Sequence, residues 1–101
     1  MGVEKFSYSI RAEITPATAK SGDMVTLKAY LNDIAGQIKN VYATVPQYGI
    51  WEVLYPSGNN TYTINYTIPW EAPPGRYEVS VYAVSSDGLR GPSTTVTLTL
   101  Q

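Results

Sequence analysis

The sequence predicts an all-β domain of antiparallel strands, packed as a sandwich or a barrel. Apolar residues recur at every second position along most of the chain, as in strands that bury one face. No stretch keeps the roughly 3.6-residue apolar period of an amphipathic helix. The chain also has 7 prolines and 8 glycines, many of which fall between the alternating segments and mark turns. The polar face on each strand favours antiparallel over parallel pairing.

Three strands are expected in the first half of the chain. The first alternates apolar with polar residues from Phe6 to Ile14 and stops at Pro16. A turn at residues 21–23 leads to the second strand, whose apolar face runs from Val25 to Leu31. Residues 32–36 read as a loop, and the third strand carries apolar residues at positions 41, 43 and 45.

Four further strands are expected in the second half, which makes seven in all. They cover residues 50–55, 62–68, 77–83 and 96–100. The segments between them are rich in turn-forming residues. These segments are residues 56–60, the proline-rich stretch 69–75, and the loop that contains Asp87 and Gly88. The 101 residues fit one domain, 1–101, with a core of its own.

The composition excludes several kinds of function. The chain has no histidine and no cysteine, which removes the commonest general base, thiolate chemistry and almost every structural zinc site. A net charge of −1 argues against nucleic acid, which needs a basic face. The eight acidic residues fall mostly in turns or at outward strand positions, so we expect neither a catalytic carboxylate pair nor a calcium site. The sequence therefore predicts a protein that is not an enzyme and has no metal or cofactor.

Targeting signals are absent from the sequence as given. Residues 1–20 lack the apolar core of a signal peptide, and no apolar run reaches the ~20 residues that would span a bilayer. Met1 and Gly2 fit a domain cut from a longer parent protein. Two N-x-S/T sequences begin at Asn59 and Asn65; they are glycosylation acceptors only if the parent is secreted, and otherwise arise by chance.

Residues 74–97 closely resemble the last two strands of a fibronectin type III domain. They contain a Pro-Gly turn before Tyr77, alternating Val, Tyr and Ala, a glycine-containing loop, and Pro-Ser before a Thr/Val strand. The resemblance implies that Tyr77 is the tyrosine corner, with its ring in the core and its hydroxyl bonded to nearby backbone. The loop lacks the Arg-Gly-Asp adhesion signal of some such domains, because Arg90-Gly91 is followed by Pro92.

The first 70 residues look more like the immunoglobulin-like repeats of bacterial and archaeal surface proteins and secreted hydrolases. The second strand opens with Gly22-Asp23-Met24-Val25-Thr26-Leu27, which fits that pattern, and it lacks the core Trp of fibronectin domains. Together the two resemblances imply a seven-stranded antiparallel immunoglobulin-like sandwich. They imply an extracellular or cell-surface setting within a larger prokaryotic protein, and they carry no catalytic residues.

Surplus aromatic residues are the main candidate site. Tyr42 and Tyr82 alternate away from the apolar positions of two strands that are neighbours in an immunoglobulin-like sheet, so both should face solvent together. Tyr48, Trp51 and Tyr55 follow the third strand and would extend this patch. Such a row can stabilise the sheet through cross-strand pairs, bury against a protein, or stack on sugar rings.

Two functions from different classes fit these observations. The first is a non-catalytic spacer or contact module, monomeric in isolation, whose odd number of strands places its termini at opposite ends. Its partners would be neighbouring domains of the parent chain or another protein. The second is a carbohydrate-binding accessory module of a secreted glycosidase, with Tyr42, Trp51 and Tyr82 as its platform.

Overall fold

The computed structural model describes residues 6–101, and Met1 and Gly2 lie outside the described residues. This part of the chain is all-β, as predicted, with one turn of 3-10 helix, η1 (Pro46–Tyr48). Its eight strands are β1 (Ser7–Thr15), β2 (Thr18–Ala19), β3 (Met24–Ala35), β4 (Ile38–Val45), β5 (Ile50–Gly58), β6 (Thr61–Thr67), β7 (Gly75–Ser85) and β8 (Arg90–Leu100). Within residues 6–101, no helix has the length and apolar composition needed to cross a membrane.

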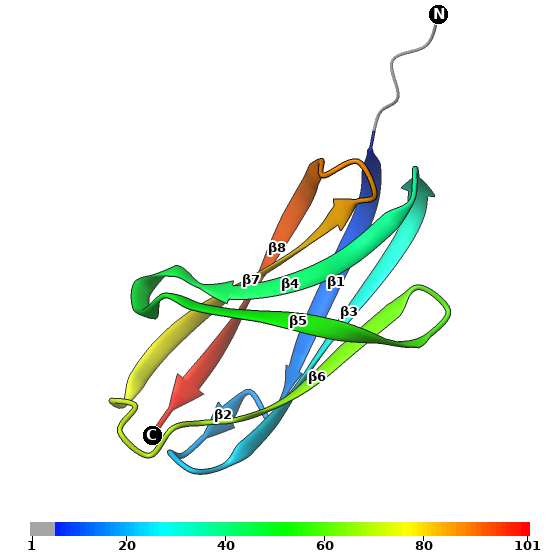
Figure 1. Ribbon diagram of the computed structural model, residues 1–101. Coiled ribbons are helices and arrows are strands. Elements are labelled where there is room, and N and C mark those ends of the chain that lie inside the picture. The colour runs from blue at the N-terminus through cyan, green and yellow to red at the C-terminus, as the bar shows by residue number, and fades with distance from the viewer. Residues whose placement is uncertain (1–5) are drawn as a thin grey trace, which may run out of the picture.

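The strands form a continuous hydrogen-bonded sheet that bends into two layers at β5. The order of the strands is β1-β3-β6-β5-β4-β7-β8-β2. The first part of β5, Ile50 to Leu54, pairs with β4, whereas the part from Tyr55 to Gly58 pairs with β6. In Figure 1, β4 and β5 cross in front of β1 and β3. The shortest extent, 16 Å, fits two layers stacked about 10 Å apart.

The prediction of seven antiparallel strands is wrong in two respects. There are eight strands in the described part of the chain, and β2 pairs with β8 in parallel. The strand that was missed has two residues, which is too short to show an alternating pattern, and it lies just beyond Pro16. Because β2 pairs with the layer opposite that of β1, the chain changes layers between them. Figure 1 shows β1 starting at the top of the molecule and β8 ending at the bottom.

Several strands also extend into segments that were expected to be loops. β3 continues to Ala35 through a bulge, because two of its residues lie opposite Tyr8 of β1. Asp33, one of the two, has a φ of +52°, a left-handed conformation that Asp tolerates better than most residues. The pairings of β5 with β6 and of β7 with β8 also shift register near their turns. Turn-forming residues therefore mark bulges here as well as chain reversals.

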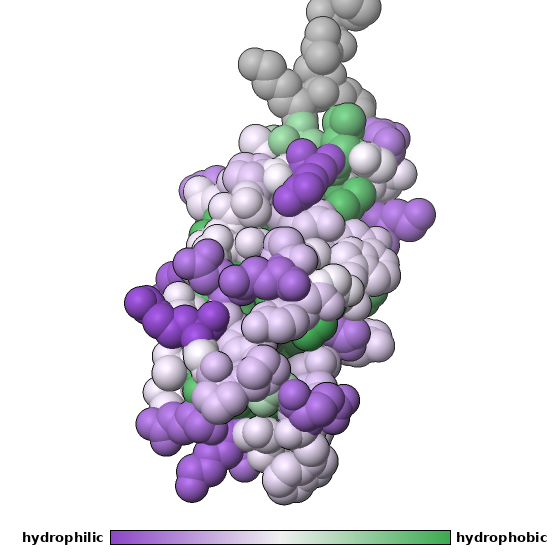
Figure 2. All heavy atoms as spheres, turned by 90° about the vertical axis from the view of Figure 1, so that its left-hand side faces the viewer, coloured by the Kyte–Doolittle hydropathy of each residue, from purple (hydrophilic) through white to green (hydrophobic). Residues whose placement is uncertain are grey.

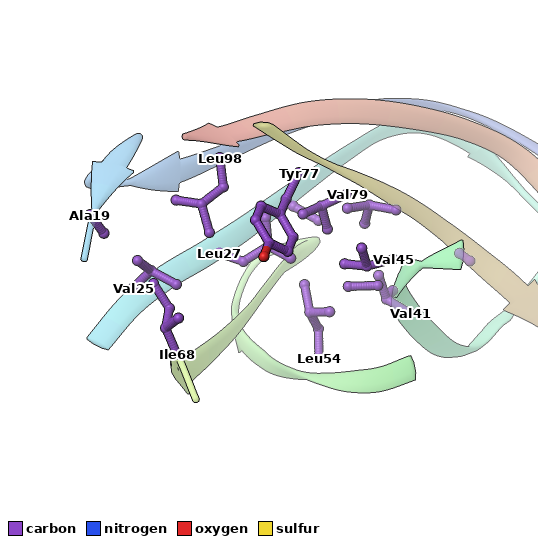
Figure 3. Packing of buried hydrophobic residues seen from close by; sticks show 14 of the residues in the cluster. Ala19, Val25, Leu27, Val41, Val45, Leu54, Ile68, Tyr77, Val79 and Leu98 are labelled. Carbon is purple, nitrogen blue, oxygen red and sulfur yellow. The ribbon is translucent and has the colours of Figure 1, made fainter. Parts of the chain in front are cut away.

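The core lies between the two layers and follows the predicted alternation. The buried side chains include Val25, Leu27, Ala29, Leu31, Val41, Ala43, Val45, Tyr77, Val79, Val81, Ala83, Leu98 and Leu100. Figure 3 shows such residues pointing from both layers into the space between them. Figure 2 shows one side of the molecule, where hydrophilic and pale intermediate residues cover most of the surface. The core is incompletely filled near the start of β7, where a cavity of about 380 Å³ lies between the layers.

Candidate contact face

Three aromatic rings and one guanidinium group form a row across the outer face of the sheet. The row, named here the aromatic ladder, consists of Trp51 on β5, Tyr42 on β4, Tyr82 on β7 and Arg90 on β8. These four strands are consecutive neighbours in the sheet. The ladder therefore joins residues that are separated by up to half the chain length.

The ladder follows from strand register and alternation. Tyr42 lies directly opposite Tyr82 in the β4–β7 pair, and their ring centroids are 5.7 Å apart at 48°. Trp51 lies diagonally across from Tyr42, and these two rings are stacked with centroids 4.6 Å apart at 25°. The Cζ atom of Arg90 lies 4.0 Å from the centroid of the Tyr82 ring, a cation–π contact.

Most of the ring faces in the ladder are covered by other members of the ladder. Because β4 lies between β5 and β7, Trp51 and Tyr82 approach Tyr42 from its two sides. Tyr42 and Tyr82 are half-buried, and Arg90 lies over the ring of Tyr82. Trp51, at the end of the row, is 54% exposed. Trp51 is therefore the most exposed ring of the ladder.

The other two aromatic residues predicted for this patch lie elsewhere. Tyr48 belongs to η1 and stacks on Tyr77, with ring centroids 4.9 Å apart at 24°, at the edge of the cavity. Tyr55 is 65% exposed and lies four residues beyond Trp51, where β5 has begun to pair with β6. The structure therefore brings together Tyr42, Trp51 and Tyr82, leaves Tyr55 farther along the same strand, and places Tyr48 apart from them.

Tyr77 is buried at the start of β7. Its hydroxyl donates a hydrogen bond to the carbonyl oxygen of Pro73, four residues upstream, at 2.5 Å. Burial, followed by the nearby Tyr48 hydroxyl, raises the pKa of Tyr77. This hydrogen bond holds the start of β7 against the proline-rich connection that precedes it.

Tyr8 is a second buried tyrosine, which sequence reasoning placed only on the apolar face of the first strand. Its hydroxyl donates to the carbonyl oxygen of Pro92 on β8 and accepts a bond of 2.8 Å from the backbone N–H of Ala83 on β7. Burial is the main reason that the pKa of Tyr8 is raised. One side chain from β1 thus links the edge of one layer to two strands of the other. These partners are more than 70 residues away, so no local pattern could reveal them.

Glu52 departs from the expectation that acidic residues lie in turns or at outward positions. It lies opposite buried Ala43 on the inner side of β5, at the lining of the cavity, and is half-buried. Glu71 also lines the cavity, and both carboxylates contribute, after burial, to raising the pKa of Tyr66. The signal was present in the sequence, since Glu52 shares its parity with inward Ile50 and Leu54.

The remaining polar candidates are accounted for by turns and surface contacts. Among residues 6–101, no cluster of three or more His, Cys, Asp or Glu side chains could hold a metal ion. The backbone N–H of Asp87 donates to Ser85 Oγ within the turn between β7 and β8. The two N-x-S/T asparagines are exposed: Asn59 lies in the β5–β6 turn, and the Asn65 side chain accepts a hydrogen bond from Thr26 at 2.9 Å.

Comparisons with known proteins support the fold alone. No family model matches the chain, and no curated protein matches it. Among solved structures, a Niemann-Pick type C2 protein from the Japanese carpenter ant superposes with a TM-score of 0.53 and 11% identity, over 99% of this chain and 96% of that one. An engineered protein superposes with a TM-score of 0.53 and 16% identity over 91% of this chain. The match spans only 20% of the engineered protein's own length.

Proposed function

We propose that this chain is a non-catalytic spacer and contact module of an extracellular or cell-envelope protein, with immunoglobulin-like strand order. The aromatic ladder would contact a neighbouring domain of the parent chain or another protein. The resemblance to fibronectin type III and prokaryotic immunoglobulin-like repeats supports this reading. The start of β1 and the end of β8 lie at opposite ends of the molecule, which also suits a spacer (Figure 1).

The close packing of the ladder's members against one another is the observation that carries the proposal. A sugar platform needs ring faces open to solvent, but the faces of Tyr42 and Tyr82 are occupied by Trp51, by each other and by Arg90. Ring edges and an arginine held over a ring suit a protein contact, in which aromatic and arginine side chains are commonly enriched. The ladder therefore favours a protein partner over a glycan.

Carbohydrate binding remains the second candidate because of two exposed aromatic residues on β5. Trp51, at the end of the ladder, is 54% exposed, and Tyr55, four residues farther along the strand, is 65% exposed. Four residues of strand separate them by about 13 Å, so they could stack on sugar units that are not adjacent.

Amide NMR of the labelled domain, titrated with a panel of soluble polysaccharides, separates the two candidates. The contact-module proposal expects a cooperatively folded monomer whose spectrum does not change. Saturable shifts around Trp51 and Tyr55 that disappear in Trp51→Ala would overturn it in favour of a carbohydrate-binding module. Trp70→Ala is the matched control, because Trp70 is 80% exposed and lies outside the ladder, against Gly22.

A further inference from the structure

The cavity between the layers lies apart from the ladder and has the size of a ligand site. Its volume of about 380 Å³ falls within the range of roughly 300–1,000 Å³ found for small-molecule pockets. Its walls are mostly apolar and come from both layers, including Leu27 of β3, Val79 of β7 and Leu98 of β8. Figure 3 shows Leu27, Val79 and Leu98 directed into the interior around Tyr77.

An apolar cavity of this size is costly for a small domain. Its lining atoms lose the packing contacts that a filled core would supply, and water finds few polar partners there. The connection between β6 and β7 borders the cavity with Pro69, Ala72 and Pro73. An apolar occupant would restore the missing contacts.

The polar groups around the cavity define the charge of the ligand. Glu52 and Glu71 are the acidic residues of its lining, and no lysine or arginine in the described part of the chain lines it. Tyr66 lines the cavity together with both glutamates. Burial is the main reason that its pKa is raised, and Glu52 and Glu71 add to this effect. The stacked rings of Tyr48 and Tyr77 also line it.

We propose that the cavity between the two layers binds a small amphiphile with an apolar body and a cationic ammonium head, the head lying near Glu52 and Glu71. A carboxylate head would be repelled by the same two residues. A neutral alcohol of equal chain length would gain the apolar contacts but no charge pairing.

A series of ligands that differ only in their head group tests this proposal. Decylamine, decanol and decanoate are compared below their micelle concentrations by displacement of the neutral fluorescent probe N-phenyl-1-naphthylamine at neutral pH, where the amine is protonated. We expect decylamine to displace the probe at a concentration at least tenfold lower than decanoate, with decanol between them. Equal or tighter binding of decanoate, or no probe binding by the folded protein, would overturn the proposal.

Variants locate the site. The double variant Glu52→Gln/Glu71→Gln should lose the preference for decylamine over decanol and keep its affinity for decanol. Ala72→Phe should block the cavity, whereas Ala35→Phe places the same side chain at an exposed position and should bind normally. If the double glutamine variant still preferred decylamine over decanol, the placement of the ammonium head near Glu52 and Glu71 would be overturned. This outcome is decisive even if Ala72→Phe fails to fold. Trp51→Ala should not affect this binding, which separates the cavity from the proposed contact face.

Discussion

At Gly91, a single missing side chain makes room for the ring that joins the two layers. A Cβ atom built on Gly91 would lie 2.3 Å from Cε2 of Tyr8 and 2.7 Å from its hydroxyl oxygen. The Tyr8 ring is 7% exposed and held by hydrogen bonds to β7 and β8, so it has little freedom to move. Glycine is therefore needed at position 91 because an aromatic ring lies against the backbone there. The backbone conformation is not the reason, because the φ of Gly91 is not in the positive range that favours glycine.

Gly91→Ala should lower the free energy of unfolding by about 1–3 kcal/mol, as overpacking in a rigid site does. Gly58→Ala is the matched control, because no atom lies within 4 Å of its Cβ position and its φ is not in the left-handed range. That variant should be neutral or more stable by up to about 1 kcal/mol. Urea denaturation measures both, and equal stability of the two variants would show that the Tyr8 ring moves aside at no cost.

At the scale of the elements, the ladder couples four strands through side chains as well as through backbone hydrogen bonds. Neighbouring members of the ladder come from neighbouring strands, in the order β5, β4, β7 and β8. Each side-chain contact therefore adds to a pairing that the backbone hydrogen bonds already make. Aromatic pairs of this geometry contribute about 0.5–1.5 kcal/mol beyond their buried area. The ladder therefore stabilises the layer that these four strands form, whether or not it also contacts a partner.

A double-mutant cycle on Tyr42→Ala and Trp51→Ala should give a coupling of about 0.5–1.5 kcal/mol in the free energy of unfolding, because their rings are stacked. The corresponding cycle of Tyr42→Ala with Trp70→Ala should be additive within about 0.3–0.5 kcal/mol. Coupling of the stacked pair no larger than that of the control pair would mean that the ladder adds nothing to sheet stability.

At the scale of the whole molecule, buried tyrosines make the fold sensitive to alkaline rather than neutral pH. The chain has nine tyrosines and no histidine, so no imidazole titrates between about pH 5 and 8. Burial raises the pKa of Tyr8, Tyr66 and Tyr77 above the ordinary value of 10.0. The unfolded chain therefore loses these protons at lower pH than the folded protein does, and the balance moves toward unfolding as pH rises.

The free energy of unfolding should stay nearly constant between about pH 6 and 9 and fall progressively above about pH 10. The raised pKa values contribute fully to the free energy of unfolding when the pH is below the tyrosine pKa of the unfolded chain. This contribution is lost as the pH rises through the tyrosine pKa values of the folded protein. Urea denaturation at a series of pH values measures the free energy of unfolding, and tyrosinate absorbance measures the titration of the tyrosines in the folded protein. Tyr8→Phe should be less stable at neutral pH but should lose less stability above pH 10, whereas Tyr55→Phe should follow the parent curve. Identical slopes for Tyr8→Phe and the parent would contradict this account.

The sequence by itself determined the class of the fold and the inner faces of most strands. The alternation of Val25 to Leu31 and of Val41 to Val45 predicted which side chains are buried, because strand periodicity is a local property of the backbone. The same alternation predicted that Tyr42 and Tyr82 each face outward, and the resemblance to immunoglobulin-like domains implied that their strands are neighbours, as they are. Even Glu52 was readable in this way from its position between Ile50 and Leu54.

Only the tertiary structure decided which strands meet and what the resulting surfaces contain. The bend of the sheet at β5, the parallel pairing of β2, and the separation of Tyr48 from the ladder depend on pairings between distant segments. The partners of Tyr8 and the cavity beside Glu52 arise where the two layers meet. Alternation fixes which side of a strand is apolar, but it carries no information on which strand lies next to it, because any strand with an apolar face satisfies the same local pattern.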